Sequence, residues 1–440
     1  MIAETGAKGR NDVAKILIVA EHASAQFGGE ALIPYQYFKC LREIGADVHM
    51  LVHARTRDEL QKAFPNDVDR LHFVSDSLLN KCCAKIGQYM PNRLAVFTVG
   101  TLSHFETQIR QRRIARFLIH SQHFNLVHEP IPVSPKLPSM MFGLSVPVII
   151  GPMNGGMDYP PNYDVTSRFE RVTVAFMRWS AGLWNKLIPG KLNAALILVA
   201  NQRTYNALPS NIQPKIMLEF AENGVDTDRF SQKENTRIRD ALNIIYVGRL
   251  VDWKRVDLLL KAGSELIGKL NFKIHVVGDG VLRGHLEDQV KDLSLTHHVR
   301  FHGWLPQFET AKLLRNADIM VLPSMRECGG AVVLEAMASG LPVIAVNWGG
   351  PADYIATDAG ILIPPDSPNK FVSELANSIM WMAVNPDLRS KMGTAGRNRA
   401  QRVYDWRVKA GILAKIYQAV VNCSNTDLEA LKMTLDALKI

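Results

Sequence analysis

Two glutamates flank a glycine pair in the second half of the chain, and their types and spacing suggest chemistry most directly. Glu327 follows the apolar segment 319–322, Gly329 and Gly330 come next, and Glu335 follows in a segment with helical periodicity. If all the steps between the two glutamates were helical, their side chains would lie about 12 Å apart along the axis and on different faces. The spacing therefore places Glu327 in a loop and Glu335 inside the helix.

A helix that starts after a glycine pair suits a bound anion. Its free N–H groups and the positive end of its dipole face the anion, which can approach the backbone closely where side chains are absent. Two carboxylates beside that position favour a ligand that is both anionic and rich in hydroxyl groups, such as a nucleotide sugar. The plain alternative is a strand, loop and helix with two solvated glutamates.

Two cations follow another predicted strand of the same half. Arg249 and Lys254 come directly after the apolar segment 244–247. A guanidinium and an ammonium at the carboxyl end of a strand can hold a diphosphate and offset the charge that builds when it leaves. Gly280 follows the next predicted strand, 272–277, where a backbone without side chains can approach a nucleotide. Two solvated surface cations are the alternative.

The first half of the chain offers matching positions. Gly28 and Gly29 follow the apolar segment 15–20, and His128 ends the segment 126–128. Because ligands of doubly wound sheets bind outside the carboxyl ends of the strands, these residues are candidates for the other side of a cleft. A plain turn and a structural histidine are the alternatives.

Strands and helices must alternate along the chain to position these residues. Continuous apolar runs rich in β-branched residues predict buried parallel strands. They lie at 15–20, 47–52, 71–74, 126–128, 146–150, 196–200, 244–247, 272–277, 299–301, 319–322 and 342–346, with helices between them, for example at 31–44 and 101–121. The pattern breaks in a polar, turn-rich stretch around 220–240. We therefore expect an α/β fold with two doubly wound, Rossmann-like domains, residues 1–220 and 221–404, and a C-terminal helix at about 405–440 that crosses back to the first domain.

Charge limits the classes of partner. The net charge is +9, of which residues 1–220 carry +7. Nucleic acid, anionic lipid or a phosphorylated substrate would each explain the basic first half. Nucleic acid is not expected, because no zinc finger, RNP-type box or KH-like loop is found in the sequence. No apolar run is long enough for a membrane span and no signal peptide is evident, so we expect a cytoplasmic protein.

Two basic segments of the first half raise the question of a membrane surface. The segment 168–191 is amphipathic, aromatic and basic, which suits a helix lying on an anionic membrane at its inner face. A helix packed on the sheet with its cations reaching solvent would have the same pattern. The cluster of Arg110, Arg112, Arg113 and Arg116 is a second candidate for lipid or phosphate contact, with a solvated helix face as its alternative.

Metal, disulfide and dinucleotide sites are not indicated. The five cysteines show neither a CxxC pair nor a Cys/His metal spacing. The segments 67–69 and 226–228 match DxD metal motifs, but one lies in a polar loop and the other in the predicted linker. The first glycine loop lacks the GxGxxG pattern of a Rossmann oxidoreductase.

Several of these motifs together resemble one enzyme family. The runs VGRLVDWKR, VGDGVLR and ECGGAVVLEAMASGLPVIA are similar to the retaining GT-B glycosyltransferases of family 4, the glycosyl transferases group 1, whose signature is two glutamates separated by seven residues. The tripeptides GGE and HEP and the segment NGVD fall where that family has its glycine loop, its cleft histidine and its linker. The resemblance covers about residues 15–421.

The resemblance implies a role for each matching residue. Arg249 and Lys254 would bind the donor diphosphate, Glu335 the nucleotide ribose and Glu327 the transferred sugar, while His128 would lie near the reacting sugar. The other substrate-binding residues would be Gly28, Gly29, Asn223, Gly280, Trp304, Gly329, Gly330, Ala331 and Val332. Gly329 departs from the family, which often has Phe at this position, so the shape of the sugar pocket is an open question.

The expected function is a retaining transfer of a hexose from a nucleotide diphosphate sugar to a saccharide or lipid-linked acceptor, in surface polysaccharide or glycolipid synthesis. No cofactor and no metal are expected, since Arg249 and Lys254 would offset the charge of the diphosphate, and the donor phosphate would help to deprotonate the acceptor. The alternative is a non-catalytic regulatory or scaffold protein that binds nucleotide sugars on the same fold.

Overall fold

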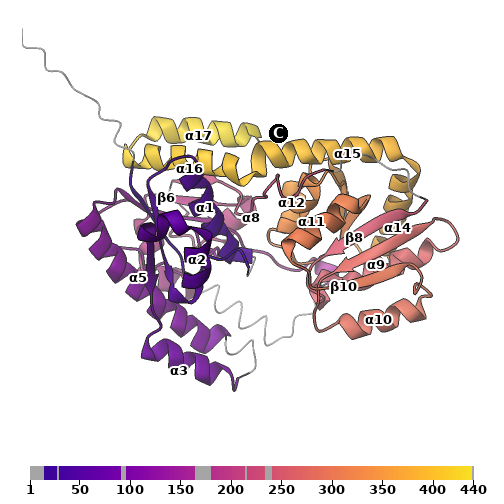
Figure 1. The fold of residues 1–440 in the computed structure, drawn as a ribbon, viewed down its shortest axis with the longest axis horizontal. Coiled ribbons are helices and arrows are strands. Elements are labelled where there is room, and N and C mark those ends of the chain that lie inside the picture. The colour runs from indigo at the N-terminus through magenta and orange to yellow at the C-terminus, as the bar shows by residue number, and fades with distance from the viewer. Residues whose placement is uncertain are drawn as a thin grey trace, which may run out of the picture.

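The computed structural model describes residues 14–26, 29–90, 96–163, 180–213, 216–232 and 240–438, which form two α/β domains side by side (Figure 1). Each domain is built on one sheet in which every described strand pair is parallel. The predicted fold of two doubly wound domains is therefore confirmed.

The first sheet has the strand order β3-β2-β1-β4-β5-β6-β7. The residues of β1, β2, β4, β5 and β6 are all buried, because helices cover both faces of the sheet. The sequence predicts 196–200 as the last strand of this domain, which is wrong, since β7 follows it. The strands are β1 (Ile16–Val19), β2 (Val48–His53), β3 (Leu71–Val74), β4 (Leu126–Glu129), β5 (Val148–Met153), β6 (Leu196–Val199) and β7 (Met217–Glu219).

Two apolar cores lie on opposite faces of this sheet. One contains α1 (Leu32–Glu43) together with the distant α16 (Trp406–Val421), and the other contains α5 (Thr101–Gln122). Further helices of the domain are α2 (Arg57–Ala63), α3 (Leu78–Gly87), α7 (Gly190–Asn193) and α8 (Gln202–Ala207), with the short 3-10 turn η1 (Gly29–Ala31). Another 3-10 turn, η5 (Pro161–Tyr163), follows β5 in the chain.

The second sheet has the order β10-β9-β8-β11-β12-β13 around a single large core. Its strands are β8 (Leu242–Val247), β9 (Phe272–Val277), β10 (Val299–Gly303), β11 (Ile319–Leu322), β12 (Val343–Val346) and β13 (Gly360–Ile363). Its helices are α9 (Val256–Glu265), α10 (Arg283–Asp292), α11 (Gln307–Asn316), α12 (Ala331–Ala338), α13 (Gly350–Tyr354), α14 (Pro368–Val384) and α15 (Pro386–Arg399).

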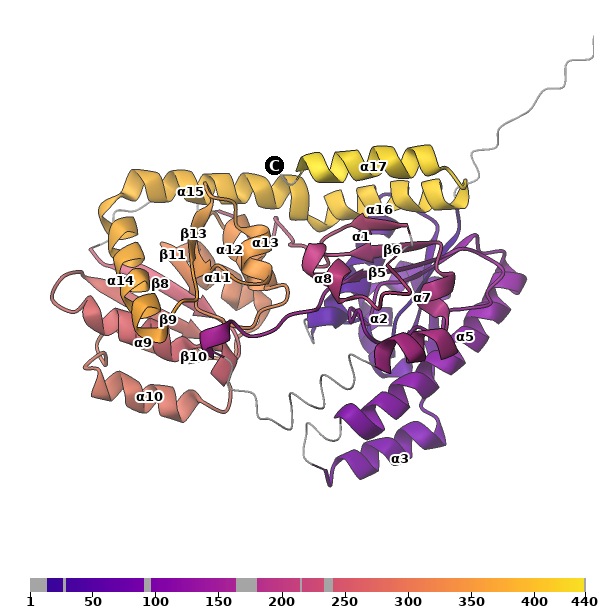
Figure 2. The ribbon, with the colours of Figure 1, turned by 180° about the vertical axis from the view of Figure 1, so that it is seen from behind.

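The chain passes between the domains at several places. After β7 it enters the second domain, and after α15 it returns through α16 and α17 (Asn425–Leu438), which run along the same side of the molecule as α15 (Figure 1). After β5, residues 154–163 also cross to the second domain, where η5 lies (Figure 2). Tyr163 at the end of this segment belongs to the apolar core of the second domain. We call residues 154–163 the strap.

Candidate active site

Arg249, Lys254 and Glu327 all lie at the carboxyl ends of the central strands of the second sheet. The strand order reverses between β8 and β11, and a crevice outside the carboxyl ends of two such strands is the usual ligand position in open α/β sheets. Arg249 and Lys254 follow β8, and Glu327 follows β11. The Lys254 ammonium contacts the Glu327 carboxylate directly, and both side chains are largely buried. Positive and negative charge are thus held together at this crevice.

Arg249 remains open at the same edge. Its side chain is exposed and lies 5.7 Å from the centre of the Trp253 ring. The Tyr246 hydroxyl donates a hydrogen bond to its carbonyl oxygen at 3.0 Å, which fixes the backbone where the strand ends. No ion pair to Arg249 is found within the described part of the chain, so its charge is available to an anion.

The glycine loop leads directly into α12. Gly330 is the N-cap of this helix with φ +80°, a conformation that glycine adopts without strain. Ala331 and Val332 form the first turn, whose N–H groups have no partner inside the helix. Glu327 lies before the helix, in the loop, as the spacing predicts.

Glu335 lies one turn further along α12. Burial raises the pKa of its carboxyl group to about 7, against the opposing effect of the Arg229 charge. Among the residues that the structure describes, none donates a hydrogen bond to this carboxylate, whose residue is only partly exposed. It is therefore positioned to accept hydrogen bonds from a ligand.

The unusual Gly329 has a steric cause. A Cβ atom at this position would lie 2.0 Å from the Glu222 carboxylate and 2.2 Å from the Asn223 amide nitrogen. Glu222 is buried, and its carboxylate accepts hydrogen bonds from Asn223 at 2.8 Å and from the Tyr354 hydroxyl at 3.2 Å. The large side chain frequent in the family has no room here. Asn223 therefore lies against Gly329 in the loop between β11 and α12. We call this loop, residues 323–330, the donor loop.

The first domain holds the loop as well, through residues that the sequence does not single out. The Cys328 carbonyl oxygen accepts hydrogen bonds from the Asn154 amide at 3.0 Å and from the Arg203 guanidinium at 3.3 Å. The Asn154 amide also donates to Glu222 at 2.6 Å. Asn154 directly follows β5, so the carboxyl edges of the two sheets face each other here. The glycine- and proline-rich composition of the strap is the one sequence signal for this contact.

His128 is placed differently from the expectation of a cleft histidine. It is fully buried in β4, with one ring nitrogen 2.7 Å from the Tyr417 hydroxyl and the other 2.6 Å from the Gly151 carbonyl oxygen. Burial lowers the pKa of this imidazole to about 4. In this conformation His128 joins β4 to α16, and a sugar does not reach it.

The remaining predicted residues lie around the cleft. Gly29 is exposed in η1 with φ +56°, whereas Gly28 lies outside the described residues. Gly280 approaches the Leu250 carbonyl so closely that a Cβ atom would lie 2.4 Å from its oxygen. Trp304, after β10, is 70% exposed, so an aromatic surface is free for a base.

The basic segments of the first domain are only partly described. Of the helix expected at 168–191, residues 164–179 lie outside the described residues, and residues 180–187 are helical with Leu183, Trp184 and Leu187 exposed. Three arginines of the α5 cluster donate to nearby carbonyl groups: Arg110 to Ser75, Arg112 to Phe142 and Arg116 to Gly143. These contacts favour a structural role for most of that cluster.

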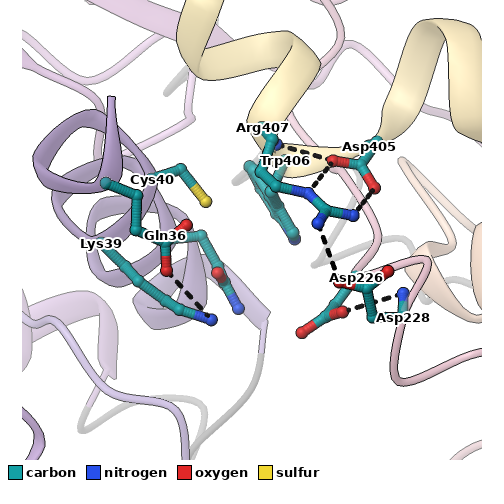
Figure 3. A pocket seen from close by; sticks show the side chains of 9 residues that line it. Gln36, Lys39, Cys40, Asp226, Asp228, Asp405, Trp406 and Arg407 are labelled. Atoms are coloured by element: carbon teal, nitrogen blue, oxygen red, sulfur yellow. Dashed lines mark hydrogen bonds and ion pairs between the residues drawn. The ribbon is translucent and has the colours of Figure 1, made fainter. Parts of the chain in front are cut away.

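The two DxD segments are the sequence candidates for a metal site. Within the described ranges, no group of three histidine, cysteine or acidic side chains is arranged to hold a metal ion. Asp67 accepts a hydrogen bond from Arg42 at 2.8 Å, and Asp228 pairs with Arg407 at 2.8 Å. Both DxD segments thus form ion pairs with arginines. The second borders a cavity of about 110 Å³ between α1, the linker and α16, away from the crevice described above (Figure 3).

Known proteins resemble both the sequence and the fold. Residues 228–399 match the family model for glycosyl transferases group 1. An uncharacterized glycosyltransferase of Methanocaldococcus jannaschii is 36% identical over 131 residues, covering 30% of this chain and 34% of that protein. The GDP-mannose-dependent alpha-(1-6)-phosphatidylinositol monomannoside mannosyltransferase of Mycolicibacterium smegmatis is 28% identical, covering 51% of this chain and 62% of its own length. The chain thus spans less than two thirds of these curated relatives.

The structural comparison agrees with the fold. The crystal structure of HepE from Anabaena in complex with UDP superimposes with a TM-score of 0.63 at 16% sequence identity, covering 92% of this chain and 100% of that one. At this identity the likeness concerns the fold. Residues 228–399 are thus similar to the glycosyl transferases group 1, within a chain that has the two-domain GT-B fold.

Proposed function

We propose that this chain is a retaining glycosyltransferase that moves a hexose from a nucleotide diphosphate sugar to a saccharide or lipid-linked acceptor in polysaccharide or glycolipid synthesis. The observation that carries the proposal is the meeting of Lys254 and Glu327 in the crevice between β8 and β11, beside the glycine-started helix α12. The family match of this domain and the UDP bound by HepE support it.

Each residue then has a chemical task. Arg249 and Lys254 bind the diphosphate and offset its charge as the glycosidic bond breaks, so that no metal ion is needed. Glu335 accepts hydrogen bonds from the ribose hydroxyls, and Glu327 releases Lys254 to the diphosphate and turns to the sugar. Asn223 and the N–H groups of the loop complete the donor site.

Donor turnover tests the proposal. A panel of UDP and GDP sugars is first screened by thermal shift, because the correct donor stabilises the folded protein by mass action. Lys254→Ala and Glu327→Ala should then lower the turnover of that donor by about 100-fold or more, as expected when a group that stabilises developing charge is lost. Lys291→Ala, which removes an exposed lysine from α10, is the matched control. Near-normal turnover in folded Lys254 and Glu327 variants would overturn these residue roles, whereas a wild type that binds a nucleotide sugar without turning it over would favour a non-catalytic sensor.

We also propose that the first domain docks on an anionic membrane, which suits a lipid-linked acceptor. The exposed side of α3 presents Leu78, Leu79 and Ile86 beside Lys81 and Lys85. Apolar side chains flanked by lysines are typical of helices that lie on anionic lipid. None of the helices described is long and apolar enough to cross a membrane.

Liposome flotation tests this second proposal. The protein should float with vesicles of 30% phosphatidylserine at low salt, and a Leu78→Ser/Ile86→Ser variant should remain in the soluble fraction. Wild-type protein that stays soluble with these vesicles would contradict membrane docking.

A further inference from the structure

The first sheet has a crevice equivalent to the one that holds Lys254 and Glu327. Its strand order reverses between β1 and β4, so the carboxyl ends of these strands border a second ligand position of the doubly wound type. Because Asn154 after β5 contacts Cys328 of the donor loop, this edge faces the donor crevice. Around it, Glu30 and Glu129 belong to the GGE and HEP tripeptides, whereas Glu21 and His104 belong to neither.

A carboxylate and an imidazole are joined at this crevice. Glu21 lies two residues after β1, and His104 lies in the first turn of α5, the helix that leads into β4. The Nδ1 atom of His104 contacts one carboxylate oxygen of Glu21 directly, and His22 Nε2 lies 3.4 Å from the other. The pair connects residues 83 positions apart in the chain.

The pair is charged and within reach of a ligand. Burial raises the pKa of Glu21, but the hydrogen bonds from His104 and His22 outweigh it and hold the pKa well below its usual range. Burial lowers the pKa of His104, and the contact with Glu21 more than reverses this. The side chain of Glu21 is 22% exposed, so part of it faces solvent. An ionised carboxylate accepts strong hydrogen bonds but is a weak base.

The surroundings select the charge of the ligand. The carboxyl groups of Glu30 in η1 and Glu129 in β4 act on His104 as well, and Glu30 also reaches the backbone N–H of Val133 at 3.5 Å. Glu129 is buried, so the crevice presents the carboxyl groups of Glu21 and Glu30 beside two histidines and has no excess of positive charge, in contrast to the basic surface of this domain. An anion is poorly matched to such a position, whereas hydroxyl groups can donate to the carboxylates.

We propose that this crevice is the acceptor subsite, in which the Glu21 carboxylate accepts a hydrogen bond from a hydroxyl group of an uncharged sugar or polyol. His104 is the positioning residue, which holds the carboxylate toward the cleft. This inference rests on the proposed glycosyl transfer and adds the chemical class of the acceptor unit. Any phosphate of a lipid-linked acceptor then lies outside this crevice.

Kinetics with simple acceptors test the subsite. The probes are methyl α-D-mannopyranoside, myo-inositol and myo-inositol 3-phosphate, together with the nucleotide sugar identified by the thermal-shift panel. Glu21→Gln should raise the KM for the uncharged probe that is used by about 10-fold to 100-fold, the loss expected for a charge-assisted hydrogen bond. Hydrolysis of the donor by water should change less than about 2-fold, because the donor crevice is intact. His104→Gln should raise the same KM by a smaller factor.

Asp76→Asn is the matched control. Asp76 follows β3, pairs with Arg55 at 2.5 Å and lies at the same edge of the sheet, two strands from the crevice. Its substitution should leave the KM for the acceptor unchanged. An unchanged KM in Glu21→Gln, or a preference of the wild type for the phosphorylated probe, would overturn the proposal, as would equal losses of transfer and donor hydrolysis.

Binding separates this inference from the proposed function. Ligand-observed NMR with the UDP-saturated protein detects methyl α-D-mannopyranoside and myo-inositol without turnover. The signal of the bound probe should be lost in Glu21→Gln and retained in Asp76→Asn. If no nucleotide sugar is turned over but this pattern is seen, the proposed function fails and the subsite stands; if neither probe binds the wild type, the subsite fails.

Discussion

At the scale of single residues, the donor loop shows why position matters more than residue type. Lys254 and Glu327 are 73 residues apart and meet because each follows a central strand of one sheet. In the ligand-free protein each neutralises the other, so a charge that would otherwise be buried and unpaired is compensated. Under the proposed function, a diphosphate that binds Lys254 would release Glu327 and so couple phosphate binding to the sugar pocket.

Gly329→Ala should disrupt this loop. The added Cβ atom would lie 2.0 Å from Glu222 and 2.2 Å from Asn223, and Glu222 is held by buried partners. We expect a loss of about 1–3 kcal/mol of stability from overpacking, and weaker nucleotide binding. Gly284→Ala is the control, because nothing lies within 4 Å of its Cβ position. Chemical denaturation and calorimetric titration with UDP and GDP would measure both effects, and equal behaviour of the two variants would contradict this account of Gly329.

Glu335 should make stability and binding depend on pH in opposite directions. Burial raises its pKa to about 7. The folded protein therefore keeps the proton that the unfolded chain has already released, so this group stabilises the fold at low pH and the stabilisation is lost as pH rises toward 7. Glu335→Gln, which stays neutral, should match the wild type in melting temperature at pH 5 and exceed it at pH 8.

Nucleotide affinity provides the second readout for Glu335. The ionised carboxylate is the better acceptor for ribose hydroxyls, so the advantage of the wild type over Glu335→Gln in nucleotide binding should grow between pH 6 and pH 8. If the ratio of the nucleotide affinities of the wild type and Glu335→Gln stays constant across this range, a hydrogen bond between Glu335 and the ribose is contradicted.

At the scale of elements, the strap couples the first domain to the donor loop. Asn154 donates to the Cys328 carbonyl, and the backbone carbonyl oxygen of Asp158 accepts a hydrogen bond from the Trp348 indole at 2.9 Å. Since a peptide unit is planar and trans, fixing this carbonyl also fixes the direction of the Gly329 N–H on its other side. The first domain therefore sets the geometry of an N–H group at the proposed donor site.

Asn154→Ala should weaken donor binding without unfolding the protein. Removing one of two donors from the Cys328 carbonyl costs about 0.5–1.5 kcal/mol, or roughly 2-fold to 10-fold in the dissociation constant of the nucleotide. Asn162→Ala lies in the same strap but contacts Asp366, away from the donor loop, and serves as control. Calorimetric titration with the nucleotide compares them, and the idea fails if the Asn154 variant binds as tightly as the control.

The elements also show what the sequence can and cannot reveal. Strands with continuous apolar runs are predicted within a few residues, and the motif residues of the second domain converge because their strands are neighbours. The short strands β7 and β13 are not predicted, since three residues at a sheet edge and a strand that starts with Gly360 carry little periodicity. The contacts of Asn154 with Cys328 and of Glu21 with His104 join residues 174 and 83 positions apart, which only the folded chain brings together.

At the scale of the whole molecule, the two domains are joined by paired chain crossings. The linker and the start of α16 run together, with a bridge between Val225 and Asp405. Arg407 ties Asp405 to Asp228 across the small cavity of this joint (Figure 3). Trp406 then enters the core of the first domain. The last helices therefore belong to the first domain by packing, although they follow the second in sequence.

Gly224→Ala should strain this joint. A Cβ atom at Gly224 would lie 2.7–2.9 Å from three atoms of the Trp406 ring, and that ring is 4% exposed, so it has little room to move. We expect a loss of about 1–3 kcal/mol of stability. A changed domain orientation should also appear as a shifted small-angle scattering profile. Gly411→Ala, in the same helix α16 with nothing within 4 Å of its Cβ, should instead be neutral or stabilising by up to about 1 kcal/mol.

The joint also links the fold to the proposed chemistry, which gives Gly224→Ala a functional consequence. Transfer needs the Glu21 crevice and the Lys254 crevice to face each other, whereas hydrolysis of the donor by water needs only the second. If the joint sets the separation of the two crevices, Gly224→Ala should reduce transfer to the acceptor more than it reduces donor hydrolysis. Adding Trp406→Leu to the Gly224→Ala variant makes space for the added methyl group, so this double variant should recover part of the ratio of transfer to hydrolysis. If the rates of transfer and of donor hydrolysis fall equally, or if the double variant shows no recovery, Gly224→Ala acts through the overall stability of the fold and not through domain orientation.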